Sequence, residues 1–241
     1  MAFSENLKKQ GNWLFKRRSY FPLLILPILL IALQDSEYLK KVAGELADSI
    51  WEGFCVAISI SGLAVRCITV GYVPEGTSGR NTRKQKAETL NTTGMYSIVR
   101  HPIYMGNFII AVGLAMFVEV WWFTLIFILA FWLYYERIIL AEEEFLLKKF
   151  GAKYSDWAKK TPTFLPKFKN WQKPNLPFSF RHVLNREHTT FFVIIASFTF
   201  MESTATLLSE GKLELDMAWA ILSVIGLILY LTMRTLKKKT N

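Results

Sequence analysis

Apolar residues gather in six segments of the chain, separated by stretches rich in charged residues. A helix needs about 20 apolar residues to cross the hydrocarbon core of a bilayer, and the longer segments approach that length. Only Glu119, Val120 and Trp121 separate the third segment from the fourth, which predicts a tight helical hairpin with Trp121 and Trp122 at a membrane interface. The pattern therefore predicts an all-α integral membrane protein with about six transmembrane helices. They cover roughly residues 20–33, 50–70, 103–118, 122–139, 190–208 and 217–233.

Basic residues are distributed unequally between the connecting segments. If the N-terminus is cytoplasmic, all of the 29 basic residues except Lys40, Lys41 and Lys212 lie in cytoplasmic segments or near the cytoplasmic ends of the predicted spans. Cytoplasmic loops of membrane proteins carry such an excess of lysine and arginine. We therefore expect six spans with both termini in the cytoplasm, in a bacterial inner membrane. The two long loops, residues 71–99 and 142–188, then face the cytoplasm.

The composition of the chain excludes several classes of protein. Hydrophobic residues make up 52% of the chain and charged residues 20%, which excludes intrinsic disorder. In so apolar a chain, the net charge of +10 fits loops beside an anionic leaflet, and we expect no nucleic-acid partner. Two cysteines (Cys55, Cys67) and three histidines (His101, His182, His188) lack the spacing of a zinc site or a disulfide framework, so we expect no metal site.

A polar cluster stands at the start of the third apolar segment. Arg100 and His101 precede Pro102, which is favourable at the first position of a helix because its missing N–H would be unpaired there. The free N–H groups and the positive dipole end at a helix N-terminus suit an anion such as a carboxylate or phosphate. Tyr104 lies one turn further, on the same side of the helix. Taken alone, such a cluster is more often an interfacial anchor of a membrane helix.

A second polar cluster follows the fourth apolar segment. Apolar residues continue to Phe150, so we expect this helix to extend into the cytoplasm. Glu142, Glu143 and Glu144 point in directions about 100° apart, and at most two of them can face one site. Taken alone, these three glutamates are interpreted as a solvated acidic turn that pairs with the lysines that follow. The tight hairpin changes this reading, because it returns Glu142 and Glu143 to the membrane face that carries Arg100.

The two clusters together resemble the isoprenylcysteine carboxyl methyltransferase family, which is related to the phospholipid methyltransferases. The resemblance covers roughly residues 62–166, and Trp157 stands where that family often has tyrosine. It divides the chain into N-terminal membrane helices (1–61), a methyltransferase core (62–170) and a two-helix extension (171–241). The matching residues are Gly94-x-Tyr96-x3-Arg100-His101-Pro102-x-Tyr104-x-Gly106 and Glu142-Glu143-x2-Leu146-x3-Phe150-Gly151-x2-Tyr154-x2-Trp157.

The resemblance implies an enzyme that uses S-adenosylmethionine without a soluble Rossmann domain. It places Tyr96, His101, Tyr104, Glu142 and Glu143 around the cofactor. Arg100 and Glu142 are the candidates for catalytic roles, with Arg100 facing an anionic group of the cofactor or the acceptor. Methyl transfer of this kind is a direct displacement, in which positioning and the exclusion of water supply much of the rate.

The methyl acceptor implied by the resemblance is a lipid or lipid-like molecule with an anionic oxygen. A carboxylate or phosphate is already ionised at neutral pH and needs no general base. We expect Arg80, Asn81 and Arg100 to contact it, because residues 76–81 offer glycine amides, hydroxyls and a cation that suit a phosphate. A flexible basic loop near anionic lipid is an equally good reading of that segment. The oligomeric state stays open.

Two other readings compete with methyl transfer. Membrane sterol-type reductases that use NADPH share a His-Pro-x-Tyr motif, but they typically continue with Gly-Glu where this chain has Gly106 and Asn107. A non-catalytic scaffold or transporter leaves the polar clusters unexplained. Transport also favours ionisable residues near the middle of the membrane, and the sequence offers few of them.

Overall fold

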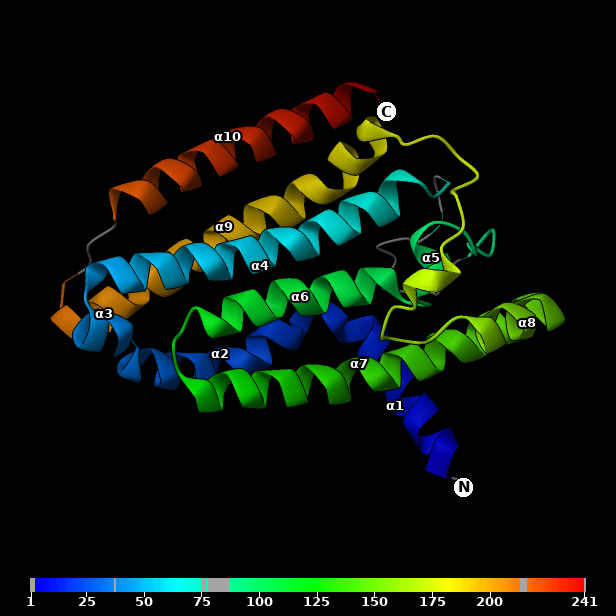
Figure 1. The fold of residues 1–241 in the computed structure, drawn as a ribbon, viewed down its shortest axis with the longest axis horizontal. Helices are drawn as coiled ribbons and strands as arrows, with labels where there is room; N and C mark the ends of the chain where they lie inside the picture. Colours follow the sequence, from blue (N-terminus) through cyan, green and yellow to red (C-terminus); the bar gives the residue numbers. More distant parts are fainter. Residues whose placement is uncertain (1–2, 37, 75–76, 78–86, 213–215, 241) are drawn as a thin grey trace.

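The computed structural model describes residues 3–36, 38–74, 77, 87–212 and 216–240, and these residues contain helices but no β-strand (Figure 1). The α-helices are α1 (Phe3–Arg17), α2 (Phe21–Ala32), α3 (Tyr38–Ala43), α4 (Glu45–Gly71), α5 (Met95–Ile98), α6 (Pro102–Met116), α7 (Trp121–Phe150), α8 (Ala152–Lys160), α9 (Phe180–Glu210) and α10 (Met217–Thr240). Short 3-10 turns cover Arg18–Tyr20 (η1), Leu33–Asp35 (η2) and Phe168–Asn170 (η3).

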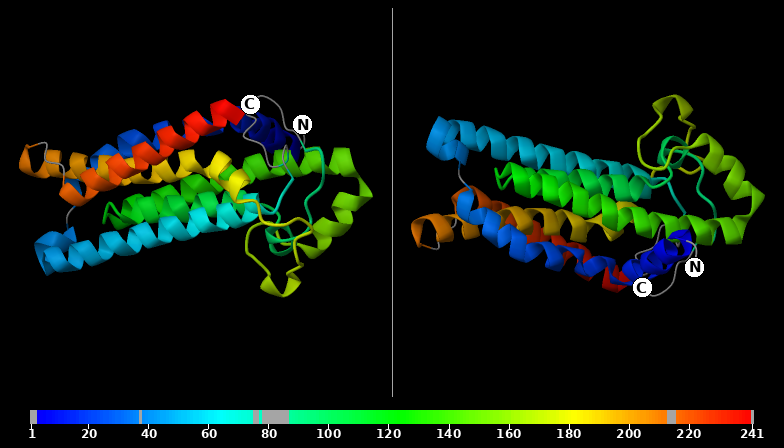
Figure 2. Two further views of the ribbon diagram at one scale, coloured as in Figure 1. Left: turned by 90° about the horizontal axis from the view of Figure 1, so that it is seen from above. Right: turned by 90° about the horizontal axis from the view of Figure 1, so that it is seen from below.

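The long helices run side by side as an elongated bundle (Figures 1 and 2). Helices α6 and α7 form the expected hairpin, and α7 continues well past the start of α6 before it ends at Gly151. Gly151 adopts a φ of 54°, a conformation that glycine reaches without steric cost, and α8 follows at once. We call the end where α6 begins and α8 lies the α8 end. The first and last helices also approach the α8 end, as the six-span topology predicts.

The expected all-helical membrane fold is confirmed, but its count of six spans is supported only in part. Four helices, α4, α7, α9 and α10, are long and apolar enough to cross a membrane. Helix α6 has 15 residues, or about 22 Å at 1.5 Å per residue, which is shorter than the hydrocarbon core. Helix α2 has 12 residues, contains Pro27, and is flanked by 3-10 turns.

Helices α4 and α6 approach each other closely through small residues. A Cβ atom at Gly62 would lie 2.7 Å from the carbonyl oxygen of Gly106, so only glycine fits there. Beside this contact, the Ser59 hydroxyl donates a hydrogen bond to the Ile110 carbonyl at 3.0 Å. The close crossing brings Arg66, one turn further along α4, against the backbone of α6.

Helix α9 packs into the same bundle as the α6–α7 hairpin. Ile194 and Phe198 are almost fully buried, and the rings of Phe198 and Phe117 meet edge to face with their centroids 4.9 Å apart. The Arg66 guanidinium also pairs with Glu187 of α9. The division of the chain into three units stays a prediction, but α9 shares one core with the segment before it.

Candidate functional site

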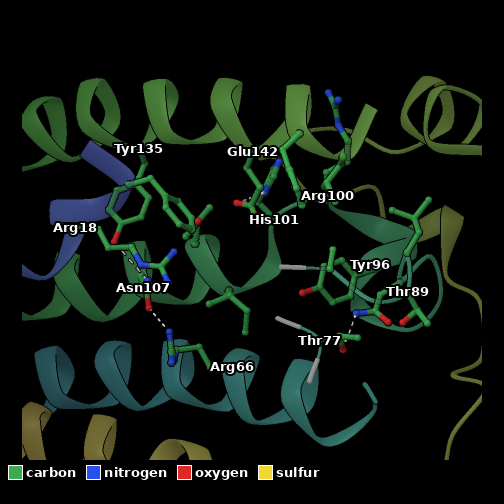
Figure 3. A pocket seen from close by; sticks show the side chains of 18 of the residues that line it. Arg18, Arg66, Thr77, Thr89, Tyr96, Arg100, His101, Asn107, Tyr135 and Glu142 are labelled. Carbon is green, nitrogen blue, oxygen red and sulfur yellow. Dashed lines mark hydrogen bonds and ion pairs between the residues drawn. The ribbon is translucent and has the colours of Figure 1, made fainter. Parts of the chain in front are cut away.

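The hairpin brings the two polar clusters of the sequence together at the α8 end (Figure 3). Arg100 Nη1 lies 3.0 Å from Glu143 Oε1, and His101 Nε2 lies 3.1 Å from the same oxygen. His101 Nδ1 is 3.9 Å from Glu142 Oε2. The start of α6 and the far end of α7 are therefore joined by ion pairs and hydrogen bonds, as the sequence predicts.

The segment after α8 holds the start of α6 in place. The backbone N–H of Arg100 donates to the Pro162 carbonyl at 2.9 Å, and the Arg100 guanidinium also bonds to the Thr163 hydroxyl. The Trp157 indole N–H donates to the Tyr96 carbonyl at 3.0 Å. These contacts cover α5 and the first turn of α6.

A polar cavity of about 230 Å³ lies between these elements. Its lining includes five of the candidate residues: Tyr96, Arg100, His101, Tyr104 and Glu142. Glu143 does not line it and instead pairs with Arg100 and His101. The other lining residues are Phe15, Arg18, Arg66, Thr77, Ala87, Thr89, Leu90, Asn91, Ile103, Asn107, Tyr135, Phe145, Leu146, Trp157 and Arg186.

Two charged side chains at this cavity have buried atoms without a hydrogen-bond partner among the described residues. They are Glu142 Oε2 and Arg100 Nε. The nearby Tyr154 hydroxyl is kept protonated, because burial, followed by the charge of Glu143, raises its pKa to about 12. His101 stacks on Tyr104 with ring centroids 5.7 Å apart. The cavity thus offers an acceptor and a donor of opposite charge beside an aromatic wall.

A second cavity of about 500 Å³ lies deeper in the bundle, between α2, α6, α7 and α9. Most of its lining is apolar, and it includes Ile25, Leu29, Ala111, Phe127 and Phe200. Three residues line both cavities: Arg18, Asn107 and Tyr135. Figure 3 shows these three side chains close together at one side of the polar cavity. We call the place where these three residues line both cavities the junction.

A buried polar network at the junction was not predicted from the sequence. The Arg66 guanidinium makes two bonds to Glu187, Nε to Oε2 at 2.8 Å and Nη2 to Oε1 at 3.0 Å. Its Nη1 bonds to Asn107 Oδ1, and Asn107 Nδ2 lies 3.5 Å from the Tyr135 hydroxyl. Arg66 lies inside the predicted span 50–70, and an ionisable residue in an apolar helix is itself a signal of a functional site.

The predicted acceptor residues Arg80 and Asn81 lie outside the described residues. Thr77, from the same segment, does line the polar cavity, and its carbonyl accepts a hydrogen bond from Arg186 at 3.1 Å. The described residues contain no group of three or more histidine, cysteine, aspartate or glutamate side chains that could hold a metal ion.

Fold and site thus define a helical membrane protein with a polar cavity at one end of its bundle, and part of this chain is similar to known proteins. Residues 54–153 match the family model described as phospholipid methyltransferase. This segment of the chain is therefore similar to the phospholipid methyltransferase family.

Several curated proteins are also similar to parts of the chain. A protein-S-isoprenylcysteine O-methyltransferase of Schizosaccharomyces pombe is 38% identical over 85 residues, which is 35% of this chain and 36% of that one. A nickel-cobalt-cadmium resistance protein of Alcaligenes xylosoxydans xylosoxydans is 32% identical over 153 residues, or 63% and 62%. A cobalt-zinc-cadmium resistance protein of Cupriavidus metallidurans is 35% identical over 124 residues, or 49% and 55%. The chain thus matches between 36% and 62% of the length of these relatives. No solved structure matches it.

Proposed function

We propose that the protein is a membrane-embedded methyltransferase that moves a methyl group from S-adenosylmethionine to a lipid or lipid-like acceptor. The observation that carries this proposal is the junction of a polar cavity with an apolar one, through Arg18, Asn107 and Tyr135. The polar cavity is lined by motif residues of the matched family segment, and the apolar cavity lies among membrane helices. A water-soluble donor and an apolar acceptor therefore have separate sites that meet.

The residues of the polar cavity fit the donor. When bound, S-adenosylmethionine supplies a methyl group on a positively charged sulfur. The unpartnered Glu142 carboxylate oxygen suits the amino group, the ribose hydroxyls or the positive charge of such a molecule, and the Arg100 Nε–H suits its carboxylate. Tyr96, His101 and Tyr104 give the aromatic surface of the site. Glu143 acts through its bonds to Arg100 and His101, which fix both side chains.

The apolar cavity supports a lipid acceptor. Ligand cavities in proteins typically measure about 300–1,000 Å³ and are mainly apolar, with a few polar groups that orient the ligand. The apolar cavity lies within this range, and three of its polar residues, Arg18, Asn107 and Tyr135, lie at the junction. An acceptor chain held there presents its head group to the polar cavity. We favour an anionic oxygen as the methyl acceptor, because Arg18 and Arg66 both lie at this point and a carboxylate or phosphate needs no proton removed.

We propose further that the α8 end faces the cytoplasm of a bacterial cell, in the inner membrane. The support is the charge distribution, since the segments at this end contain nearly all of the basic residues of the chain. Arg80 and Asn81 remain proposed contacts of the acceptor head group, and Thr77, from the same segment of the sequence, lines the polar cavity.

A cavity-filling variant tests the acceptor site. Ala111 lines the apolar cavity from α6, and phenylalanine at this position occupies space that the proposed acceptor chain needs. We expect Ala111→Phe to bind S-adenosylmethionine like the wild type but to lose transfer of labelled methyl to a total lipid extract. Lipid methylation at the wild-type rate in this variant would show that the acceptor binds elsewhere.

A further inference from the structure

Four helices contribute one side chain each to the buried network at the junction: Arg66 from α4, Asn107 from α6, Tyr135 from α7 and Glu187 from α9. Arg66 is 9% exposed and Glu187 is 3% exposed. Glu187 lies beyond residues 54–153, the part of the chain that matches the family model. A residue of the C-terminal extension therefore reaches the interior of the family segment.

Stability alone gives little reason for this ion pair. Removing two charges from water costs several kcal/mol per ion, and apolar residues of similar volume often replace a buried pair without loss of stability. In an apolar bundle, such charged side chains mark a functional site by default. The position of the pair supports this, because Arg66 lines the polar cavity directly and Asn107 lines both cavities.

The network fixes the direction of the Asn107 amide. A guanidinium only donates hydrogen bonds, so the Arg66 Nη1 bond must end on Asn107 Oδ1. The amide nitrogen then faces the Tyr135 hydroxyl across the junction, at 3.5 Å. Glu187 holds the guanidinium in the orientation that makes this bond, through two of its N–H groups.

Donor groups therefore face the junction. The Arg66 guanidinium has five N–H groups. Its Nε bonds to Glu187, its Nη2 bonds to Glu187 and Thr190, and its Nη1 bonds to Asn107. One N–H group, on Nη1, is therefore left without a partner among the described residues. The Asn107 amide N–H groups add further donors at the junction, and the cationic side chain of Arg18 lines both cavities there. Such an array of N–H groups suits an anionic oxygen.

We propose that Arg66 and Asn107 bind the anionic head group of the methyl acceptor, and that Glu187 is the positioning residue that orients Arg66. This inference rests on the proposed methyltransferase function and extends the acceptor site to α9. It assigns the C-terminal extension a role in the reaction, because the acceptor site is incomplete without Glu187.

Two variants test this inference in the full-length protein in detergent. Glu187→Gln keeps the shape of the side chain and removes its charge. The double variant Arg66→Met with Glu187→Leu replaces the pair by apolar side chains, a change that buried ion pairs often tolerate. Glu144→Gln is the matched control, because Glu144 pairs with Lys148 at the surface of the same bundle. The measurements are the thermal midpoint, the Kd for S-adenosylmethionine, and kcat and KM for a total lipid extract.

We expect Glu187→Gln to raise the KM for lipid at least tenfold, which corresponds to about 1.4 kcal/mol of lost binding, with the Kd for the methyl donor unchanged. The double variant should fold, bind the donor and transfer no methyl to lipid. A folded double variant with the wild-type KM would overturn the inference and leave a structural ion pair only. Weaker donor binding in both variants would also overturn it, because the network would then belong to the donor site. Absence of methyl transfer by the wild type would instead reject the proposed function, and the inference with it.

Discussion

The carboxylate of Glu142 gives the sharpest prediction for the donor site. Its Oε2 is buried at the polar cavity without a hydrogen-bond partner, and the His101 ring nitrogen at 3.9 Å is too distant to provide one. Glu142→Gln preserves the volume of the side chain but removes the charge and one acceptor oxygen. A hydrogen bond to a charged group contributes about 1.5–3 kcal/mol. Because the Glu142 side chain is 31% exposed, we take the lower part of this range, about 1.5–2 kcal/mol.

This free energy corresponds to a Kd for S-adenosylmethionine that is weaker by about 10- to 30-fold, since about 1.4 kcal/mol equals a factor of ten. Isothermal titration calorimetry of the purified protein in detergent measures it directly. Glu144→Gln is the control, because Glu144 is two residues away on α7 and pairs with Lys8 and Lys148 instead of lining the cavity. Equal donor affinity of Glu142→Gln and the wild type would refute the assignment of this carboxylate to the donor site.

Three further predictions concern packing and pH. Gly106→Ala places a Cβ 2.6 Å from Arg66 Cγ, so overpacking by about 1–3 kcal/mol should lower the thermal midpoint, whereas Gly53→Ala, with open space around its Cβ, should not. Burial raises the pKa of Glu119 in the α6–α7 turn from 4.5 to about 7. Folding therefore favours the neutral carboxyl, so the wild type is most stable below pH 4.5 and loses stability as the pH rises through 7. Glutamine resembles the neutral carboxyl and does not titrate, so the wild type should become less stable than Glu119→Gln over that interval in thermal scans. Trp157→Phe removes a donor to a carbonyl of α5 and should lower the free energy of unfolding by about 0.5–1.5 kcal/mol in denaturant titrations. An unchanged free energy of unfolding would contradict this role of the indole.

Local patterns in the sequence were sufficient to predict the α6–α7 hairpin and the meeting of its two polar clusters. A connection as short as residues 119–121 leaves two apolar helices no arrangement except antiparallel neighbours. Apolar positions up to Phe150 predicted that α7 extends beyond the membrane segment, and it does. The contact of Arg100 with Glu143 follows from these two features.

The sequence could not decide which of the adjacent glutamates faces the cavity. Successive residues of a helix differ by about 100°, so the answer depends on the rotation of α7 about its axis, which packing against α1 and α6 determines. In the structure, Glu142 lines the cavity while Glu143 pairs with Arg100 and His101.

Local patterns in the sequence could not predict the junction either. Arg66 and Glu187 are 121 residues apart, and no periodicity connects them. Their pairing requires that α9 packs against α4, which depends on the arrangement of the whole bundle. The apolar cavity has the same origin, because α2, α6, α7 and α9 form it together. Arg66 alone could have been identified as a candidate functional residue, because it is a charged residue inside an apolar segment.

The measurement that tests the account most directly is transfer of labelled methyl from S-adenosylmethionine to a total lipid extract by the purified protein in detergent. We predict a labelled lipid whose label is released by base or acid as expected for an ester of a carboxylate or phosphate. At low donor concentration, Glu142→Gln should form this product about 10- to 30-fold more slowly. A folded protein that yields no labelled lipid and shows no thermal shift with S-adenosylmethionine, but a shift with NADPH, would contradict methyl transfer and favour a reductase.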